Sequence, residues 1–143
     1  MEIKIKTALG ALVPQYSTAE SAGADVHAYL DKPVVCPAGG WIAVPTGVFL
    51  EIPAGYEVQV RPRSGLALRH GITVLNAPGT IDSDYRGELK IVLINHSKQD
   101  YTITPGDRIA QLVAARVEKI QFTPTVQIGS TPRGEGGFGS TGK

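Results

Sequence analysis

Short apolar or alternating runs, separated by proline- and glycine-containing turns, recur along most of this sequence. The runs span residues 3–5, 41–44, 48–52, 57–61, 72–75, 89–94, 101–104 and 126–128. Turn sequences such as Pro53-Ala54-Gly55, Pro78-Gly79 and Pro105-Gly106 lie between them. Several short strands with regular turn signals are typical of all-β sandwiches and barrels. We therefore expect an all-β sandwich or barrel.

Two segments do not follow the strand pattern clearly. Residues 109–117 fit a strand or a helix by pattern alone, whereas residues 64–70 favour a short helix with Ser64 near its start. The chain has 143 residues, 42% of them hydrophobic, which suffices for one compact domain but not for two ordinary ones. We expect one domain over residues 1–128 and a glycine-rich tail over residues 129–143.

The net charge of the chain is +1, which implies no general attraction to nucleic acid or to a membrane surface. An anionic ligand would have to be held by local groups. Residues 1–6 alternate apolar and charged side chains, unlike a signal peptide, and no segment approaches the ~20 apolar residues of a membrane helix. The single cysteine, Cys36, excludes an internal disulfide. We expect a cytoplasmic protein with a packed thiol.

The C-terminal residues 133–142 combine five glycines with an arginine, an aromatic residue and two hydroxyl side chains. Glycine lets backbone N–H groups approach a ligand closely, while Arg133 offers charge, Phe138 a stacking surface and Ser140 a hydroxyl. The segment is a candidate clamp for a phosphate and a base. A disordered tail has the same composition, so the choice depends on the rest of the sequence.

Three internal clusters carry polar groups beside apolar runs. Asp25 follows a glycine at the start of an apolar segment, where a turn aspartate is the ordinary alternative. Arg63 and Ser64 stand together at a possible helix start, which suits a phosphate but also an exposed strand end. Gln111 lies in residues 108–112, which otherwise read as a buried strand with one polar residue.

Residues 76–88 form the most polar internal cluster. Gly79 and Gly87 bracket two aspartates, Tyr85 and an arginine between two apolar runs. We expect a β-hairpin whose exposed backbone groups read the edge of a base, and an ordinary polar hairpin is the alternative.

Together, residues 22–25, 62–67, 79–88, 108–112 and 133–142 resemble the five ordered motifs of the homotrimeric deoxyuridine triphosphatases. The resemblance covers nearly the whole chain, and one difference is Ala24, where a bulkier residue is frequent. It implies a jelly-roll-like all-β fold with at most one short helix, and a homotrimer with shared active sites. It also implies Mg²⁺-assisted hydrolysis of dUTP to dUMP and pyrophosphate, which limits uracil in DNA and supplies dUMP for dTMP synthesis.

The resemblance also implies roles for individual residues. Asp82 would activate the attacking water, and Asp25 would hold Mg²⁺ through water. The phosphates would be held by Arg63, Ser64, Gly65, Gln111 and Arg133, and the closing tail would add Gly139 and Ser140. Uracil would be read by Asn76 and by backbone groups of Thr80 and Ile81, with Phe138 stacked on it. Tyr85 would pack on the deoxyribose, and Lys90 would also touch substrate.

Two other functions remain possible on the same fold. One is deamination of dCTP, which residues 62–65 disfavour because they lack the paired serines of that branch. The other is a non-catalytic nucleotide-binding barrel, which the presence of Asp82 disfavours.

Overall fold

The computed structural model describes residues 1–139, which form twelve β-strands and one short helix. The elements are β1 (Lys4–Thr7), β2 (Gln15–Tyr16), β3 (Ala24–His27), β4 (Val34–Cys36), β5 (Trp41–Pro45), β6 (Val48–Glu51), β7 (Tyr56–Arg61), α1 (Ser64–His70), β8 (Ile72–Val74), β9 (Gly79–Ile81), β10 (Lys90–Asn95), β11 (Tyr101–Ile103) and β12 (Arg108–Arg116). The predicted all-β class with one short helix is confirmed. Residues 109–117, which fitted either pattern, lie almost entirely in β12.

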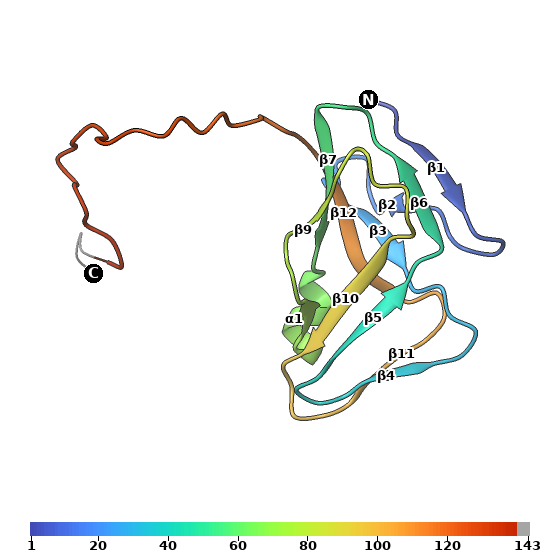
Figure 1. Ribbon diagram of the computed structural model, residues 1–143. Coiled ribbons are helices and arrows are strands. Elements are labelled where there is room, and N and C mark those ends of the chain that lie inside the picture. The colour runs from blue at the N-terminus through green and yellow to red at the C-terminus, as the bar shows by residue number, and fades with distance from the viewer. Residues whose placement is uncertain (140–143) are drawn as a thin grey trace.

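The strands pair antiparallel throughout. A five-stranded sheet has the order β2-β3-β12-β7-β9, and a three-stranded sheet has the order β5-β10-β8. The pairs β1–β6 and β11–β4 complete a jelly-roll-like barrel (Figure 1).

The core lies between these sheets and is built from alternate residues of the strands. In β10, Ile91 and Leu93 are buried while Lys90 and Val92 face outward, as the two-residue period of a strand requires. The buried amide of Asn95 donates to the carbonyls of Cys36 (3.0 Å) and Gln99 (2.8 Å). Cys36 is a packed thiol, as expected, and burial raises its pKa.

The predicted helix at residues 64–70 is confirmed as α1. Arg63 occupies the N-cap position in an extended conformation, and Ser64 is the first helical residue. Gly71 ends the helix with a φ of 66°, a left-handed conformation that glycine adopts without steric penalty. The side chain of Arg63 contacts Asp25 of β3.

The expected hairpin over residues 76–88 is wrong in its pairing. Gly79–Ile81 pairs with β7 as β9, whereas β10 pairs with β5 and β8. The segment is therefore the long connection from β8 to β10, and on its way it adds an edge strand to the five-stranded sheet. The free edge of β7 supplies backbone partners for this pairing, and buried Gly79 fits against Val60.

The expected strand at residues 126–128 is also wrong. Residues 117–139 pair with no strand of the barrel. Beyond Arg116 the chain runs away from the barrel, and Val126 and Ile128 are exposed (Figure 1). The division of the chain at residue 128 into a barrel and a closing tail stays a prediction. Among residues 1–139, no helix has the length and hydropathy that crossing a membrane requires.

Candidate active site

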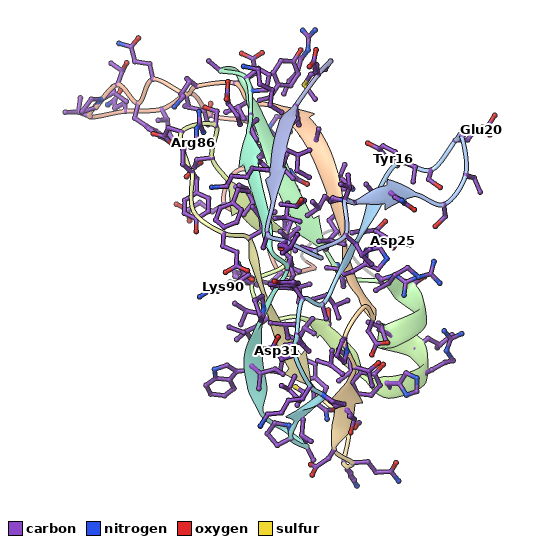
Figure 2. All side chains as sticks on the ribbon, turned by 90° about the vertical axis from the view of Figure 1, so that its right-hand side faces the viewer. Tyr16, Glu20, Asp25, Asp31, Arg86 and Lys90 are labelled. Atoms are coloured by element: carbon purple, nitrogen blue, oxygen red, sulfur yellow. The ribbon has the colours of Figure 1, made fainter. Side chains whose placement is uncertain are left out.

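Apart from Asn76, the predicted site residues of the barrel fall into two groups, each lining its own pocket. The arginine pocket, of about 280 Å³, is lined by Ser17, Ser21, Ala22, Gly23, Asp25, Arg63, Ser64, Gly65 and Gln111. The tyrosine pocket, of about 410 Å³, is lined by Thr80, Ile81, Asp82, Tyr85, Glu88, Leu89 and Lys90. The two pockets share no lining residue. Figure 2 shows Asp25 on the side of α1 and both Arg86 and Lys90 on the opposite side of the barrel.

Strand register assembles the arginine pocket. Asp25 of β3 lies directly opposite Gln111 of β12, so both side chains stand on the same face of the sheet. β7 lies on the other side of β12, and the chain that leaves it carries Arg63, Ser64 and Gly65 into the same pocket. Residues far apart in sequence therefore meet because three neighbouring strands present them together.

Asp25 is the electrostatic centre of this pocket. Its Oδ1 accepts a hydrogen bond from Arg63 Nε (2.9 Å), and its Oδ2 accepts hydrogen bonds from Arg108 Nη1 (3.1 Å) and Ser17 Oγ (3.1 Å). The Asp25 side chain is only 12% exposed, so these contacts stabilise a carboxylate that has lost most of its hydration. The neighbouring His27 adds little positive charge, because burial lowers the pKa of its imidazole although the charge of Asp25 raises it.

Gln111 is fixed between two backbone segments. Its Nε2 donates to the carbonyl of Pro62 (2.9 Å), and its Oε1 packs against the Cα of Gly23. A Cβ at residue 23 would overlap that oxygen and lie 2.9 Å from the Gln111 Cδ. Gly23 is therefore needed for the position of the Gln111 amide, which suits contact with an oxygen-rich ligand.

Arg108 contacts Asp25 although it was not among the predicted site residues. Arg108 and Gln111 are three positions apart, so a regular strand would place them on opposite faces. A register shift between Arg108 and Ala110 inserts Ile109 as an extra residue, and both Ile109 and Ala110 are buried. This β-bulge returns Arg108 to the face of Asp25. Two adjacent apolar residues between an arginine and a glutamine are the only signal of the bulge in the sequence.

The tyrosine pocket is built by a turn that begins at Asp82. The Tyr85 N–H donates to the Asp82 carbonyl (3.2 Å), and the Tyr85 hydroxyl donates to the Glu88 carbonyl (3.1 Å). Arg86 Nη1 donates to the carbonyls of Ser83 (2.7 Å) and Tyr85 (3.0 Å). These hydrogen bonds within the segment stabilise the turn.

The carboxylate of Asp82 stays exposed, and no residue among 1–139 donates a hydrogen bond to it. Glu88 fixes the end of this segment just before β10, because its Oε1 accepts a hydrogen bond from the Gly47 N–H (2.9 Å). The pocket thus combines a free carboxylate, an aromatic ring and Lys90, which suits a polar ligand that carries a flat or ring-shaped part.

The remaining predicted site residues lie outside both pockets. Asn76 is exposed, and its side-chain amide packs beside Gly79 at the start of β9. Arg133, Phe138 and Gly139 lie on the tail, which extends away from the barrel (Figure 1). Arg133 Nε donates to the Gly136 carbonyl (2.8 Å), and Phe138 is fully exposed. Ser140 lies outside the described residues.

The donor set of the arginine pocket can be tested against the predicted Mg²⁺. Residues 1–139 contain no group of three His, Cys, Asp or Glu side chains placed to hold a metal ion. Mg²⁺ does not need such a group, because it keeps several waters and is bound through one or two carboxylates together with substrate phosphates. One carboxylate, Asp25, beside hydroxyl and amide side chains fits that pattern.

Comparisons with known proteins give the family. The family model described as dUTPase matches residues 10–142. A deoxyuridine 5'-triphosphate nucleotidohydrolase of Anaplasma marginale is 54% identical over 140 residues, covering 98% of this chain and 95% of that protein.

Two solved structures of Staphylococcus phage proteins are also similar. A mutant dUTPase of bacteriophage 80alpha with dUpNHpp has a TM-score of 0.88 at 24% identity, covering 99% of each chain. A mutant dUTPase of phage phi11, described with a structural Mg(II) ion, has a TM-score of 0.79 at 22% identity, covering 89% of this chain and 98% of that one. At 22–24% identity these structures support the fold alone. Membership of the family rests on the family model and on the relative that is 54% identical. The chain belongs to the dUTPase family.

Proposed function

We propose that this chain hydrolyses dUTP to dUMP and pyrophosphate by attack of water on the α-phosphorus. The observation that carries the proposal is the division of polar groups between two pockets. One pocket offers an arginine, hydroxyl and amide groups suited to phosphates, and the other offers a free carboxylate beside an aromatic ring. Phosphoryl transfer needs little more from a protein than positioning, charge neutralisation and a group that orients water.

Asp82 is the proposed general base. Its carboxylate is exposed, and no described residue competes for its oxygens, so they are free to accept a proton from water. The turn bonds from Tyr85 and Arg86 fix the backbone that carries it. Asp84 is also exposed but does not line the tyrosine pocket, which makes it a suitable comparison.

Arg63, Ser64, Gly65 and Gln111 are proposed to hold the phosphates, with Arg133 and the tail residues Gly139 and Ser140 closing over them. Guanidinium groups suit this role because they make charge-assisted, often bidentate hydrogen bonds to phosphate. Asp25 is proposed to hold Mg²⁺ through water, and the phage phi11 relative is described with a structural Mg(II) ion. When bound, Mg²⁺ would neutralise part of the phosphate charge.

Uracil is proposed to be read by Asn76 and by backbone groups of Thr80 and Ile81. A donor facing the 4-position of the base would be left unpaired by the amine of cytosine, which disfavours dCTP. Tyr85 would pack against the deoxyribose and exclude a 2′-hydroxyl. Lys90 lines the same pocket, and Phe138 would stack on the base when the tail closes.

The protein is proposed to be a homotrimer with shared sites. Asp25 and Lys90, which line different pockets, lie on opposite sides of the barrel (Figure 2), and this supports a site to which two chains contribute. A closed ring lets the arginine pocket of one chain face the tyrosine pocket of the next, and a third chain supplies the tail.

Incubation of the purified protein with dUTP, UTP, dCTP and dTTP tests the proposed reaction. We expect stoichiometric dUMP and pyrophosphate from dUTP and much slower turnover of the other nucleotides. Ammonia release from dCTP would instead indicate a deaminase, and binding of dUTP without turnover would indicate a non-catalytic barrel.

A further inference from the structure

Two arginines form ion pairs with Asp25, and only one of them lines the arginine pocket. Arg63 lines the arginine pocket and its side chain is 23% exposed. Arg108 does not line the pocket, and its side chain is 52% exposed. Each guanidinium binds a different oxygen of the carboxylate. Arg63 is thus the inner partner, within reach of a ligand, and Arg108 is the outer partner.

The inner arginine keeps donors for a phosphate while it holds Asp25. Arg63 Nε already donates to Asp25, and Arg63 Nη1 donates to the Arg108 carbonyl (3.3 Å). Within residues 1–139 no acceptor takes the N–H groups of Arg63 Nη2, so they remain for a phosphate. Without Arg108, the Oδ2 of Asp25 would be open to Arg63, whose guanidinium could then bind both carboxylate oxygens as a fork and keep fewer donors for the phosphates.

We propose that Arg108 is a positioning residue, which occupies Oδ2 of Asp25 and so leaves the Nη2 group of Arg63 for the phosphates of the substrate. This inference rests on the function proposed above. The β-bulge at Ile109 is the structural device that makes it possible, because it brings Arg108 to the face of Asp25. Arg108 acts through Asp25 and Arg63 and does not itself touch the nucleotide.

Arg108→Ala is the direct test, with Arg108→Lys and Arg116→Ala beside it. Arg116 ends the same strand and lies over the Tyr56 ring, 5.8 Å from its centre, so its removal changes the net charge equally without touching Asp25. The probe is a non-hydrolysable imido analogue of dUTP in the presence of Mg²⁺, with dUMP for comparison. Binding is measured by calorimetry, and kcat and KM are measured with dUTP.

We expect Arg108→Ala to weaken binding of the analogue about tenfold or more, the effect of losing one hydrogen bond to a charged group. Binding of dUMP should change much less, KM should rise more than kcat falls, and Arg108→Lys should recover part of the loss. Arg116→Ala should resemble the wild type. Equal losses for the analogue and dUMP, or equal effects of Arg108→Ala and Arg116→Ala, would overturn the proposal.

A double-mutant cycle with Arg63→Ala separates a positioning role from direct phosphate contact. If Arg108 acts through Arg63, adding Arg108→Ala to Arg63→Ala should weaken analogue binding little further. Additive losses would contradict the proposal. The wild-type reaction separates this inference from the proposed function. If the wild type does not hydrolyse dUTP, the proposed function fails. If it does and Arg108→Ala binds the analogue as the wild type does, only the role of Arg108 is refuted. Melting temperatures identify variants that do not fold.

Discussion

The ring of Tyr85 lies against the Cα of Gly87, in the space that a methyl group on residue 87 would fill. A Cβ at Gly87 would overlap the hydroxyl oxygen and the ring carbons of Tyr85. The hydroxyl of the same ring donates to the Glu88 carbonyl (3.1 Å). Glycine at position 87 and the hydrogen bond to residue 88 therefore fix the ring orientation together.

We predict that Gly87→Ala relaxes sugar discrimination while the Tyr85 ring is still present. The φ angle of Gly87 is not positive, so alanine suits the backbone and only the ring must move. The ratio of kcat/KM for dUTP to that for UTP should fall, in the same direction as for Tyr85→Ala. Gly129→Ala is the control, because nothing lies within 4 Å of its Cβ position. An unchanged dUTP/UTP ratio in both Gly87→Ala and Tyr85→Ala would contradict the role given to the ring.

We predict that Gly23→Ala raises KM for dUTP by displacing the Gln111 amide. The three atoms nearest to the new Cβ all belong to Gln111, so the damage should pass through that side chain. A loss of about tenfold in kcat/KM is expected from one displaced hydrogen-bonding group. In a Gln111→Ala background the same substitution should have little effect. A large effect in that background would place the conflict elsewhere.

We predict that Asp82→Asn abolishes turnover and leaves analogue binding largely intact. The amide keeps the shape of the side chain and loses the charge that a general base needs. A fall in kcat of roughly 10²–10⁴-fold is typical for removal of such a base. Asp84→Asn, in the same turn but outside the tyrosine pocket, should retain most of the activity. Near-normal kcat in Asp82→Asn would remove Asp82 from the mechanism.

His27 should make the barrel less stable in mild acid. Burial lowers the pKa of His27 below its ordinary value of 6.5. The negative charge of Asp25 raises this pKa in part, and the positive charges of Arg108 and Arg63 lower it further. As pH falls below 6.5, the unfolded chain takes up this proton before the native one, so stability is lost until the pH passes the lowered native pKa. Above pH 6.5 both states are neutral and the loss is absent.

Melting temperatures between about pH 7.5 and about pH 5 test this expectation. His27→Gln should flatten the decline relative to the wild type, whereas His96→Gln, at an exposed position, should not. Parallel curves for the wild type and His27→Gln would show that His27 does not titrate differently on unfolding.

The sequence predicted the parts of the fold that depend on local pattern. Alternation predicted β7, a short apolar run predicted β10, and the residues of α1 favoured a helix. β3 was not predicted because it has only four residues and because Asp25 also fits a turn. The pairing of β9 with β7 depends on an open sheet edge and could not be read from residues 76–88 alone.

The site shows the same limit. Chemical type and the family resemblance grouped Asp25, Arg63 and Gln111, and the register of β3, β12 and β7 accounts for their meeting. Arg108 was not among the predicted site residues because the face on which it lies depends on one extra residue in β12. A bulge arises from strand pairing, and the sequence alone does not fix where the pairing slips.

Deletion of residues 131–139 together with the four residues that follow should cripple catalysis and leave the barrel folded. Among residues 131–139 the side chains are exposed or only half-buried, and none belongs to the buried core. The melting temperature should therefore stay close to that of the full chain while kcat/KM for dUTP falls sharply. A collapse of the melting temperature would show that the tail stabilises the fold.

Mixing this tail-deleted protein with Asp82→Asn tests whether the sites are shared. Each protein alone should be nearly inactive, since one lacks the closing tail and the other the general base. If each site takes Asp82 from one chain and the tail from another, some sites in mixed trimers combine an intact Asp82 with an intact tail. Partial dUTP hydrolysis should then return after the two proteins are unfolded and refolded together.

Two measurements make the mixing result decisive. Light scattering should give a trimer for the wild type, and mass spectrometry of differently tagged chains should confirm that mixed trimers form. Refolding each variant alone is the control, because recovery there would reflect refolding and not complementation. Mixed trimers without activity, or a monomer in light scattering, would refute the shared site, whereas the role of Asp82 would still stand on its own variant.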